Sequence, residues 1–518
     1  APVDLLYNGG IGTYVKAAAE SDAEVGDRAN DAVRIDGGEL RARVVGEGGN
    51  LGFTQRGRIE YALAGGRIFT DAIDNSGGVD CSDHEVNIKI LLGEVVADGE
   101  LERAARDRLL ADMTEEVAAM VLADNYAQGE VLEMIAAGGV ALLDEQADFM
   151  LRQARAGRLN RRLEALPLDE DLAERRAAGR GLVAPELAVL LAYSKIELYD
   201  EVLASDVPDD AFVARALPAY FPAPIRERWG GRIAAHALRR EIVATVVVNE
   251  LVNRCGATFV DRIRAETGAP APDIVRAFIA TWDVFALDGC WREIATLDNR
   301  APAALQVAMR VDVLRLVRGA TLWWLRHPQW LADLGATAEH FAPDVAMLAE
   351  TLGERIAPEH SAALAERAAA MTADGASEAL ALRVAGLRAR LASLDIVDLA
   401  SERSLEAGHV AEVYFALAAE LDLRWVTLQI DALSADSRWP SLARSALRAD
   451  LSAEARRLVG LALTTSDQSD DPAARVQAFV QACGDRLERY RALVTEMRGG
   501  GADMAMLSVL MRALRGLG

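Results

Sequence analysis

Two glycine-rich segments hold the residues of this chain whose types and spacing could do chemistry. Residues 44–50 read Val-Val-Gly-Glu-Gly-Gly-Asn, and residues 75–82 read Asn-Ser-Gly-Gly-Val-Asp-Cys-Ser. Each segment follows an apolar run, as expected where a strand of a parallel sheet ends, and ligands bind at the carboxyl ends of such strands. Glycine lets the backbone come close to a ligand, while Asn and Ser supply neutral hydrogen bonds. We therefore expect residues 1–95 to contain part of a ligand site.

Ser82 and Asn75 are the two side chains in these segments with the clearest alternative roles. Ser82 can cap a helix that begins at Asp83, with Glu85 completing a capping box, and this role needs no ligand. A hydroxyl at a helix N-terminus can equally bind a substrate carboxylate. Asn75 is either a turn residue or an amide that donates to a cofactor. The residues themselves leave both alternatives open.

Other catalytic patterns fail on their spacing. Residues 10–12 and 46–48 both begin like the dinucleotide fingerprint GxGxxG, but Val15 and Leu51 occupy the third glycine position. The run at 83–85, Asp-His-Glu, cannot converge on one ion, because neighbouring helical residues do not face each other. The remaining histidines are scattered without the spacing of zinc ligands, so we predict no metal site.

Composition narrows the class of protein. The 518 residues carry a formal net charge of −23, which argues against nucleic acid and anionic membrane as partners. No apolar run reaches the ~20 residues that a membrane helix needs. The four cysteines are widely spaced and include no CxxC pair, which suits a cytoplasmic protein with reduced thiols. Only three of the 56 basic residues are lysines, so each is of interest: Lys16, Lys89 and Lys195.

The first 95 residues have an α/β pattern. We predict strands at 3–7, 40–46 and 67–73 and a helix over 54–64 that ends at two glycines. Strand, helix and strand at this spacing imply a right-handed crossover in a parallel sheet. Three strands are too few for a doubly wound sheet, so we expect the chain to be a fragment of a longer protein.

The rest of the chain has a helical pattern. We predict a helical connection over 96–180 and an all-helical C-terminal domain over 181–518. Ala, Leu and Arg dominate the composition and favour helix. Apolar residues also recur at helical spacing, as at Leu305, Met309, Val313, Leu316 and Ala320. Clustered tryptophans at 323, 324 and 330 indicate a helical core or a subunit contact.

These segments resemble one protein family. Residues 40–89 resemble the distal half of the nicotinamide-binding domain of glutamate dehydrogenases. The segment at 47–50 is similar to that family's Glu-Gly-Ala-Asn turn, and the segment at 70–82 to its Pro-Asp-x-x-x-Asn-x-Gly-Gly-Val-x-x-Ser motif. Thr70 replaces the family's usual Pro, and Gly49 its Ala. Four further segments resemble the large-subunit, NAD-specific bacterial class: 4–14, 83–90, 184–197 and 221–260.

The resemblance implies a site and a fold. The fold would be the distal half of a Rossmann-like parallel sheet followed by an all-helical region. NAD would be the cofactor, and the residues that contact it would be Gly48, Gly49, Asn50, Asn75, Gly77 and Gly78. Ser82 would bind the side-chain carboxylate of glutamate. The family's catalytic Lys and Asp have no counterpart here, so we assign no catalytic residue and expect the fragment alone to be inactive.

The resemblance also implies an activity. The whole enzyme would oxidatively deaminate L-glutamate to 2-oxoglutarate and ammonia, as a homo-oligomer. An alternative function is a helical oligomerisation or regulatory module attached to an amino-acid dehydrogenase.

Overall fold

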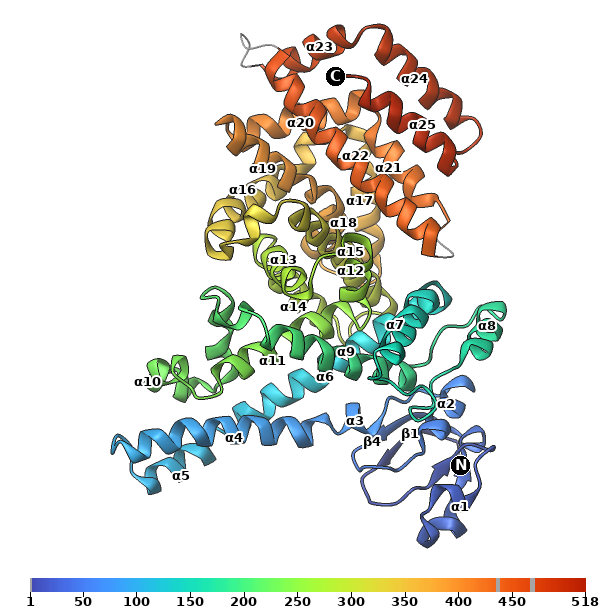
Figure 1. Ribbon diagram of the computed structural model, residues 1–518, viewed down its shortest axis with the longest axis vertical. Coiled ribbons are helices and arrows are strands. Elements are labelled where there is room, and N and C mark those ends of the chain that lie inside the picture. The colour runs from blue at the N-terminus through green and yellow to red at the C-terminus, as the bar shows by residue number, and fades with distance from the viewer. Residues whose placement is uncertain (1, 435–437, 466–470) are drawn as a thin grey trace. The chain divides into compact units, whose positions relative to one another are not determined.

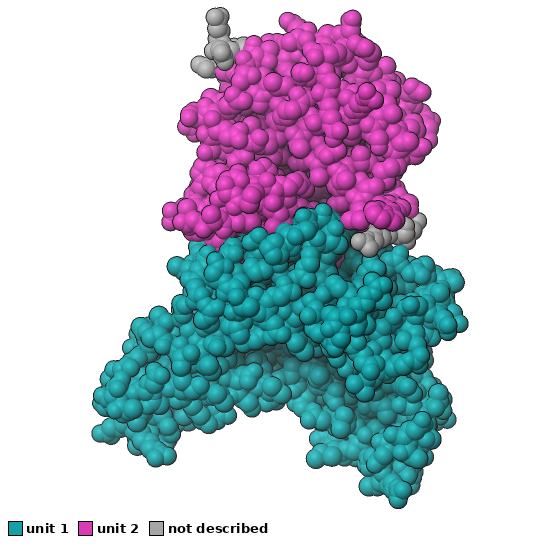
Figure 2. Space-filling view, viewed as in Figure 1, with its two compact units in different colours: residues 1–276 teal, residues 277–518 magenta. Residues whose placement is uncertain are grey.

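The computed structural model describes residues 2–434, 438–465 and 471–518 (Figure 1). The chain forms two compact units, Ala1–Arg276 and Ala277–Gly518 (Figure 2). Short parallel strands occupy the N-terminal end and helices the rest, which confirms the predicted fold class. The divisions at residues 95 and 180 stay predictions.

The first strands form a small parallel sheet. β1 (Val3–Asn8) pairs with β4 (Ala42–Glu47), with Leu6 opposite Val45. A second parallel pair joins β2 (Val15–Lys16) to β3 (Ile35–Asp36). The strands predicted at 3–7 and 40–46 are therefore present, and parallel. Between them lie three short helices: α1 (Asp22–Val25), η1 (Arg28–Val33) and η2 (Gly37–Glu39).

The third predicted strand, at 67–73, is wrong. Within this segment only Arg67 pairs with β4 as a strand residue, through an isolated parallel bridge to Val44. Thr70 already precedes the short helix α3 (Asp71–Asp74), so the chain turns before a ladder can continue. The predicted helix at 54–64 is present as α2 (Gln55–Leu63), where the Thr54 hydroxyl accepts a hydrogen bond from the Gly57 amide.

A small core lies beneath these strands. Its buried members are Val15, Ala42, Val45, Phe53, Tyr61 and Ile68. The Tyr61 hydroxyl donates to the Ala42 carbonyl at 2.8 Å, which satisfies the one polar atom that this ring brings into the core. α2 is thereby fixed to β4, the strand that leads into the first glycine-rich segment.

The predicted helix start at Asp83 is also wrong. α4 (Ser76–Ala97) begins directly after Asn75, and Gly77 and Gly78 already lie in its first turn. Ser82 is therefore inside the helix, and its hydroxyl donates to the Gly78 carbonyl at 3.3 Å. Because the amides near Ser82 already bond within the helix, no capping box with Glu85 can form.

Helices make up the remainder of the first unit. α4 packs against α6, and α6 packs against α9 and α11 (Figure 1). Pro185 occupies the first turn of α9, where a residue without a backbone N–H loses no helical hydrogen bond. These helices are α5 (Arg103–Asp112), α6 (Thr114–Gly138), α7 (Leu143–Arg155), α8 (Asp169–Ala177), α9 (Ala184–Leu203), α10 (Ala223–Ala234), α11 (Arg239–Cys255) and α12 (Phe259–Thr267). Three 3-10 turns join them, η3 (Gly139–Leu142), η4 (Val207–Asp209) and η5 (Val213–Tyr220).

The second unit is helical throughout its described residues. α13 (Ala271–Val284) spans the boundary between the units. The helices that follow are α14 (Leu287–Ala295), α15 (Ala303–Arg326), α16 (Leu334–Arg355), α17 (Pro358–Ala373), α18 (Glu378–Arg390), α19 (Ala392–Arg403), α20 (Ala407–Glu420), α21 (Leu423–Ala432), α22 (Arg438–Thr465), α23 (Pro472–Cys483), α24 (Asp485–Arg498) and α25 (Met504–Arg515), with the 3-10 turn η6 (Pro328–Leu331) after α15. Among the described residues, no helix is both long enough and apolar enough to cross a bilayer.

The predicted apolar face of α15 is buried from Leu305 to Ala320. Trp323 and Trp324 pack edge-on against each other and against Phe341, within the core of this unit. The Trp323 indole donates to Asp395 at 2.7 Å, which gives the buried ring a hydrogen-bond partner. The tryptophan cluster is thus part of a helical core.

Candidate functional site

Asn50 and Asn75 meet at the end of β4. Asn50 lies in the turn after the strand, and Asn75 occupies the junction of α3 and α4. The Asn75 side-chain amide donates to the Asn50 side-chain oxygen at 3.1 Å, in an exposed position. Two polar side chains from the separate glycine-rich segments are thus brought together beside the carboxyl end of a parallel strand.

The glycines beside these amides are required by the chain's own packing. A Cβ on Gly48 would overlap the Tyr7 hydroxyl, and a Cβ on Gly49 would lie 2.6 Å from the Gly10 carbonyl oxygen. The Gly49 amide donates to the Asn8 carbonyl at 2.9 Å, which holds the two strand-end loops together. A fold requirement therefore accounts for both glycines without any ligand.

Gly77 and Gly78, in the first turn of α4, leave room for the side chains that pack against this turn. A Cβ on Gly77 would lie 3.2 Å from Val121, and a Cβ on Gly78 would lie 2.9 Å from the Asn75 side-chain oxygen. Ser82 lies exposed one turn further along this helix, where only the Gly78 carbonyl accepts from its hydroxyl among the described residues. The structure thus places Asn50 and Asn75 in contact and Ser82 on the adjoining helix.

A buried ion pair anchors the turn that carries Asn50. The Arg58 guanidinium contacts the Glu47 carboxylate through two bonds of 2.7 and 3.0 Å, and Glu47 is fully buried. Arg58 also lies 3.1 Å from Asp71, which accepts from the Leu51 amide, while Asp74 accepts from the Glu47 amide. Burial raises the pKa of the Glu47 carboxyl, and Arg58 opposes that rise.

This anchor was not expected from the sequence. Asp71 occupies a specified position of the motif at 70–82 and Asp74 an unspecified one, and no local pattern relates Arg58 to Glu47. The pair forms because α2 packs back onto β4, a contact that sequence spacing does not reveal.

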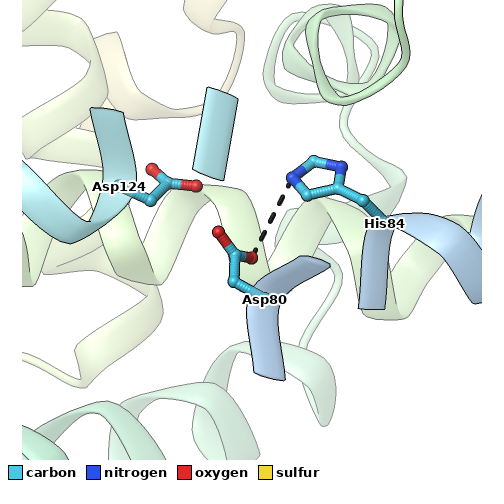
Figure 3. A group of neighbouring side chains, drawn as sticks. All are labelled: Asp80, His84 and Asp124. Carbon is cyan, nitrogen blue, oxygen red and sulfur yellow. Dashed lines mark ion pairs between the residues drawn. The ribbon is translucent and has the colours of Figure 1, made fainter. Parts of the chain in front are cut away.

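A second group of polar side chains gathers between α4 and α6. Asp80 and His84 lie one turn apart on α4 and face Asp124 of α6 (Figure 3). One ligand-type atom from each residue lies within 4.8 Å of the other two. His84 Nε2 and an Asp80 carboxylate oxygen are 3.9 Å apart. His84 thus has partners from other turns, and not the neighbouring Asp83 and Glu85.

Burial dominates the electrostatics of this group. Loss of solvent raises the pKa of Asp80, and repulsion from Asp83 adds to that rise. Loss of solvent likewise raises the pKa of Asp124, with further repulsion from Asp80. The same burial lowers the pKa of His84 and so favours its neutral form, while Asp124 opposes that shift.

The three lysines differ in their surroundings. Lys16 pairs with Asp36, and Lys89 pairs with Glu85 on the exposed side of α4. Lys195, on α9, faces the cluster of Asp80, His84 and Asp124. Desolvation lowers the pKa of Lys195 to about 8, although Asp124 and Asp80 favour its charged form.

Tyr220 completes the surroundings of this cluster. Its ring stacks on the imidazole of His84, with 4.2 Å between the ring centroids. Its hydroxyl accepts from the Asn87 side-chain amide at 3.0 Å. The cluster is thereby enclosed by groups from α4, α6, α9 and η5.

Comparisons with known proteins cover the whole chain. Residues 179–516 match the family model described as "Glutamate dehydrogenase, C-terminal". Residues 1–135 match the model described as "Bacterial NAD-glutamate dehydrogenase, catalytic domain". The second match includes both glycine-rich segments and the junction of α4 with α6.

Three curated relatives have similar sequences, and each is named an NAD-specific glutamate dehydrogenase. The chain is 43% identical over 518 residues to the protein of Pseudomonas aeruginosa, an alignment that covers 100% of this chain and 32% of the relative. The relatives from Halomonas elongata and Mycobacterium tuberculosis are each 42% identical, over 99% of this chain and 32% of their own length. The chain thus spans about a third of these relatives.

Proposed function

We propose, because the chain belongs to the bacterial NAD-dependent glutamate dehydrogenase family, that it supplies the distal part of the NAD and glutamate site of a longer enzyme. That enzyme would oxidise L-glutamate to 2-oxoglutarate and ammonia. NAD, when bound, accepts the hydride from the substrate's α-carbon. The residues of this chain would bind and orient the two reactants.

The contact between Asn50 and Asn75 is the observation that carries this proposal. One amide hydrogen bond joins them at 3.1 Å, and among the described residues the Asn75 side-chain oxygen and the Asn50 side-chain nitrogen have no other hydrogen-bond partner. A nicotinamide carboxamide presents one donor group and one acceptor, so it complements this pair. The glycines at 48, 49, 77 and 78 keep the surrounding backbone free of side chains, so the cofactor can approach it.

Ser82 is proposed to bind the side-chain carboxylate of glutamate. Its hydroxyl is exposed, and its bond to the Gly78 carbonyl is long at 3.3 Å, so little is lost when it turns to a ligand. A hydrogen bond to a charged group contributes about 1.5–3 kcal/mol. Loss of that bond corresponds to roughly a ten- to hundredfold fall in kcat/KM.

The test compares serine variants of the intact enzyme. Ser82→Ala should raise the KM for glutamate and leave the KM for NAD unchanged. Ser508→Ala is the matched control, because Ser508 is also an exposed helical serine that bonds to the carbonyl four residues earlier. Equal kinetics for wild type and Ser82→Ala would remove Ser82 from the substrate site.

Asn75→Ala tests the cofactor part separately. It should raise the KM for NAD more than the KM for glutamate, because the Asn50 amide would lose its partner. An unchanged KM for NAD would contradict the assignment of the amide pair to the nicotinamide.

We further propose that the 518-residue chain alone is inactive. The family's catalytic Lys and Asp, and its dinucleotide fingerprint, match no position of this sequence. Purified chain should bind NAD weakly and show no glutamate-dependent NAD reduction. Steady turnover by the purified chain would refute this proposal.

A second candidate function is assembly or regulation by the helical region. The C-terminal unit is compact by itself, and none of the residues proposed for the NAD and glutamate site lies in it. It would hold subunits of a homo-oligomer together. Deletion of residues 277–518 from the intact enzyme should then lower the particle mass in light scattering. A deletion that raises only the KM for NAD would favour completion of the active site instead.

A further inference from the structure

The cluster of Asp80, His84 and Asp124 lies on the side of α4 that faces away from Ser82. Asp80 and His84 are four residues apart and share one helical face, whereas Ser82 falls midway between them on the opposite face. Asp124 reaches the same space from α6 (Figure 3). An inference from this cluster therefore does not rest on the proposed dehydrogenase function.

The cluster contains buried polar atoms that lack partners. The His84 side chain is 2% exposed, and its Nε2 faces the two carboxylates, while Nδ1 lies on the opposite side of the ring (Figure 3). One Asp80 carboxylate oxygen, Oδ2, is buried without a hydrogen-bond partner among the described residues. The other ring nitrogen, His84 Nε2, points at Asp80 but stays 3.9 Å away, which is too far for a hydrogen bond. Native proteins rarely leave buried polar atoms such as Asp80 Oδ2 and His84 Nε2 without hydrogen bonds, so this arrangement points to a ligand between the three side chains.

We propose that Asp80, His84 and Asp124 bind a divalent transition-metal cation, for which Zn²⁺ is the best match. Carboxylate oxygen and imidazole nitrogen are both Zn²⁺ ligands, whereas Mg²⁺ and Ca²⁺ prefer oxygen alone. Three protein ligands leave the fourth tetrahedral position for water. The cation would link α4 to α6 and would hold the helix that carries Ser82.

The geometry requires a modest contraction. The three ligand atoms now lie within 4.8 Å of one another. Tetrahedral Zn²⁺ with bonds of about 2.0–2.1 Å separates its ligands by about 3.3 Å. A bound cation would therefore draw α4 and α6 together at this point, and both carboxyls would be ionised in the complex.

Lys195 limits the affinity of this site. Its ammonium donates to Gln128 at 3.4 Å and, among the described residues, forms no ion pair with either carboxylate. It partly offsets the two negative charges and would repel an added cation. Removal of the ammonium should therefore strengthen metal binding. If Lys195 had only a structural role, its removal would not be expected to tighten the binding of a cation.

The experiment titrates Zn²⁺ into the metal-stripped 518-residue chain by calorimetry. Wild type should bind one equivalent at this site. Asp124→Asn keeps the shape of the side chain but should weaken that binding at least tenfold, and Lys195→Met should tighten it about tenfold. Glu133→Gln is the matched control, because Glu133 is an exposed carboxylate of the same helix, α6. It should leave the binding unchanged.

Co²⁺ absorption provides a measurement that does not depend on the stability of a variant. Wild-type chain with Co²⁺ should give the intense visible bands of a four-coordinate site, and Zn²⁺ should displace them. The proposal fails if wild type shows no saturable Zn²⁺ binding and no such bands. It also fails if Asp124→Asn binds as tightly as Glu133→Gln, or if Lys195→Met weakens binding.

Discussion

Replacing Arg58 by methionine should loosen the turn that carries Asn50. The Arg58 and Glu47 side chains are 6% and 0% exposed, and Arg58→Met leaves the Glu47 carboxylate buried without its counter-charge. Removal of one partner from a buried pair costs about 3–5 kcal/mol. At about 1.4 kcal/mol per decade, this corresponds to a loss of two to nearly four orders of magnitude in amide protection.

The cost should grow with pH. The pKa of Glu47 is already raised by burial, so its ionisation disfavours the fold as pH rises above the unfolded value of ~4.3. Arg58 is the group that opposes that rise, and without it the folded pKa rises further. The difference between Arg58→Met and wild type should therefore be smaller at pH 5 than at pH 8.

Hydrogen exchange measures this effect locally, which matters in a chain with two compact units. Protection in β4 and α2 is compared for wild type, Arg58→Met and Arg43→Met. Arg43 is the matched control, because it pairs with Asp4 while both side chains are more than four-fifths exposed, at 82% and 89%. An exposed pair contributes only about 0–1 kcal/mol.

Two results would refute the reasoning. One is equal protection in Arg43→Met and Arg58→Met. The other is a failure of Glu47→Gln to recover protection when it is combined with Arg58→Met, because the double variant no longer buries an unpaired charge.

Three other predictions concern separate parts of the chain. Gly49→Ala, which restores the residue usual in the family, should loosen the strand-end loops because its Cβ would lie 2.6 Å from the Gly10 carbonyl oxygen; faster exchange of the residue 49 amide would show this. Cys81 is exposed and should be the fastest thiol to react with a disulfide reagent, and Cys81→Ser should abolish that fast phase. Trp323→Phe removes the 2.7 Å bond to buried Asp395 and should destabilise the C-terminal unit by about 1.5–3 kcal/mol, measured as lost amide protection in α15 and α19.

Local sequence signals predicted the elements that local contacts decide. The apolar run at 40–46, the helix predicted over 54–64 and the apolar spacing from Leu305 to Ala320 each correspond to an observed strand, helix or buried face. The parallel pairing of β1 with β4 agrees with the parallel sheet that the pattern of strand, helix and strand predicted. The contact between Asn50 and Asn75 was not predicted, because it depends on how α3 and α4 follow β4.

Tertiary contacts decided what the sequence could not show. Ser82 has the residue type of a helix cap, yet α4 begins at Ser76 because the chain turns at Asn75 and the glycines continue as helix. Asp124 is far from His84 in the sequence, so no motif relates them. Their approach depends on how α4 packs on α6, which residue spacing does not encode.

The small sheet has a consequence for handling the chain. Among the described residues β1 pairs only with β4, so its other edge offers unpaired backbone groups. Val3, Leu5 and Tyr7 on this strand are 44%, 59% and 66% exposed. An open apolar strand edge is a template for strand addition by another copy. The isolated chain should therefore aggregate at high concentration through its first eight residues, and a soluble preparation needs that edge covered or charged.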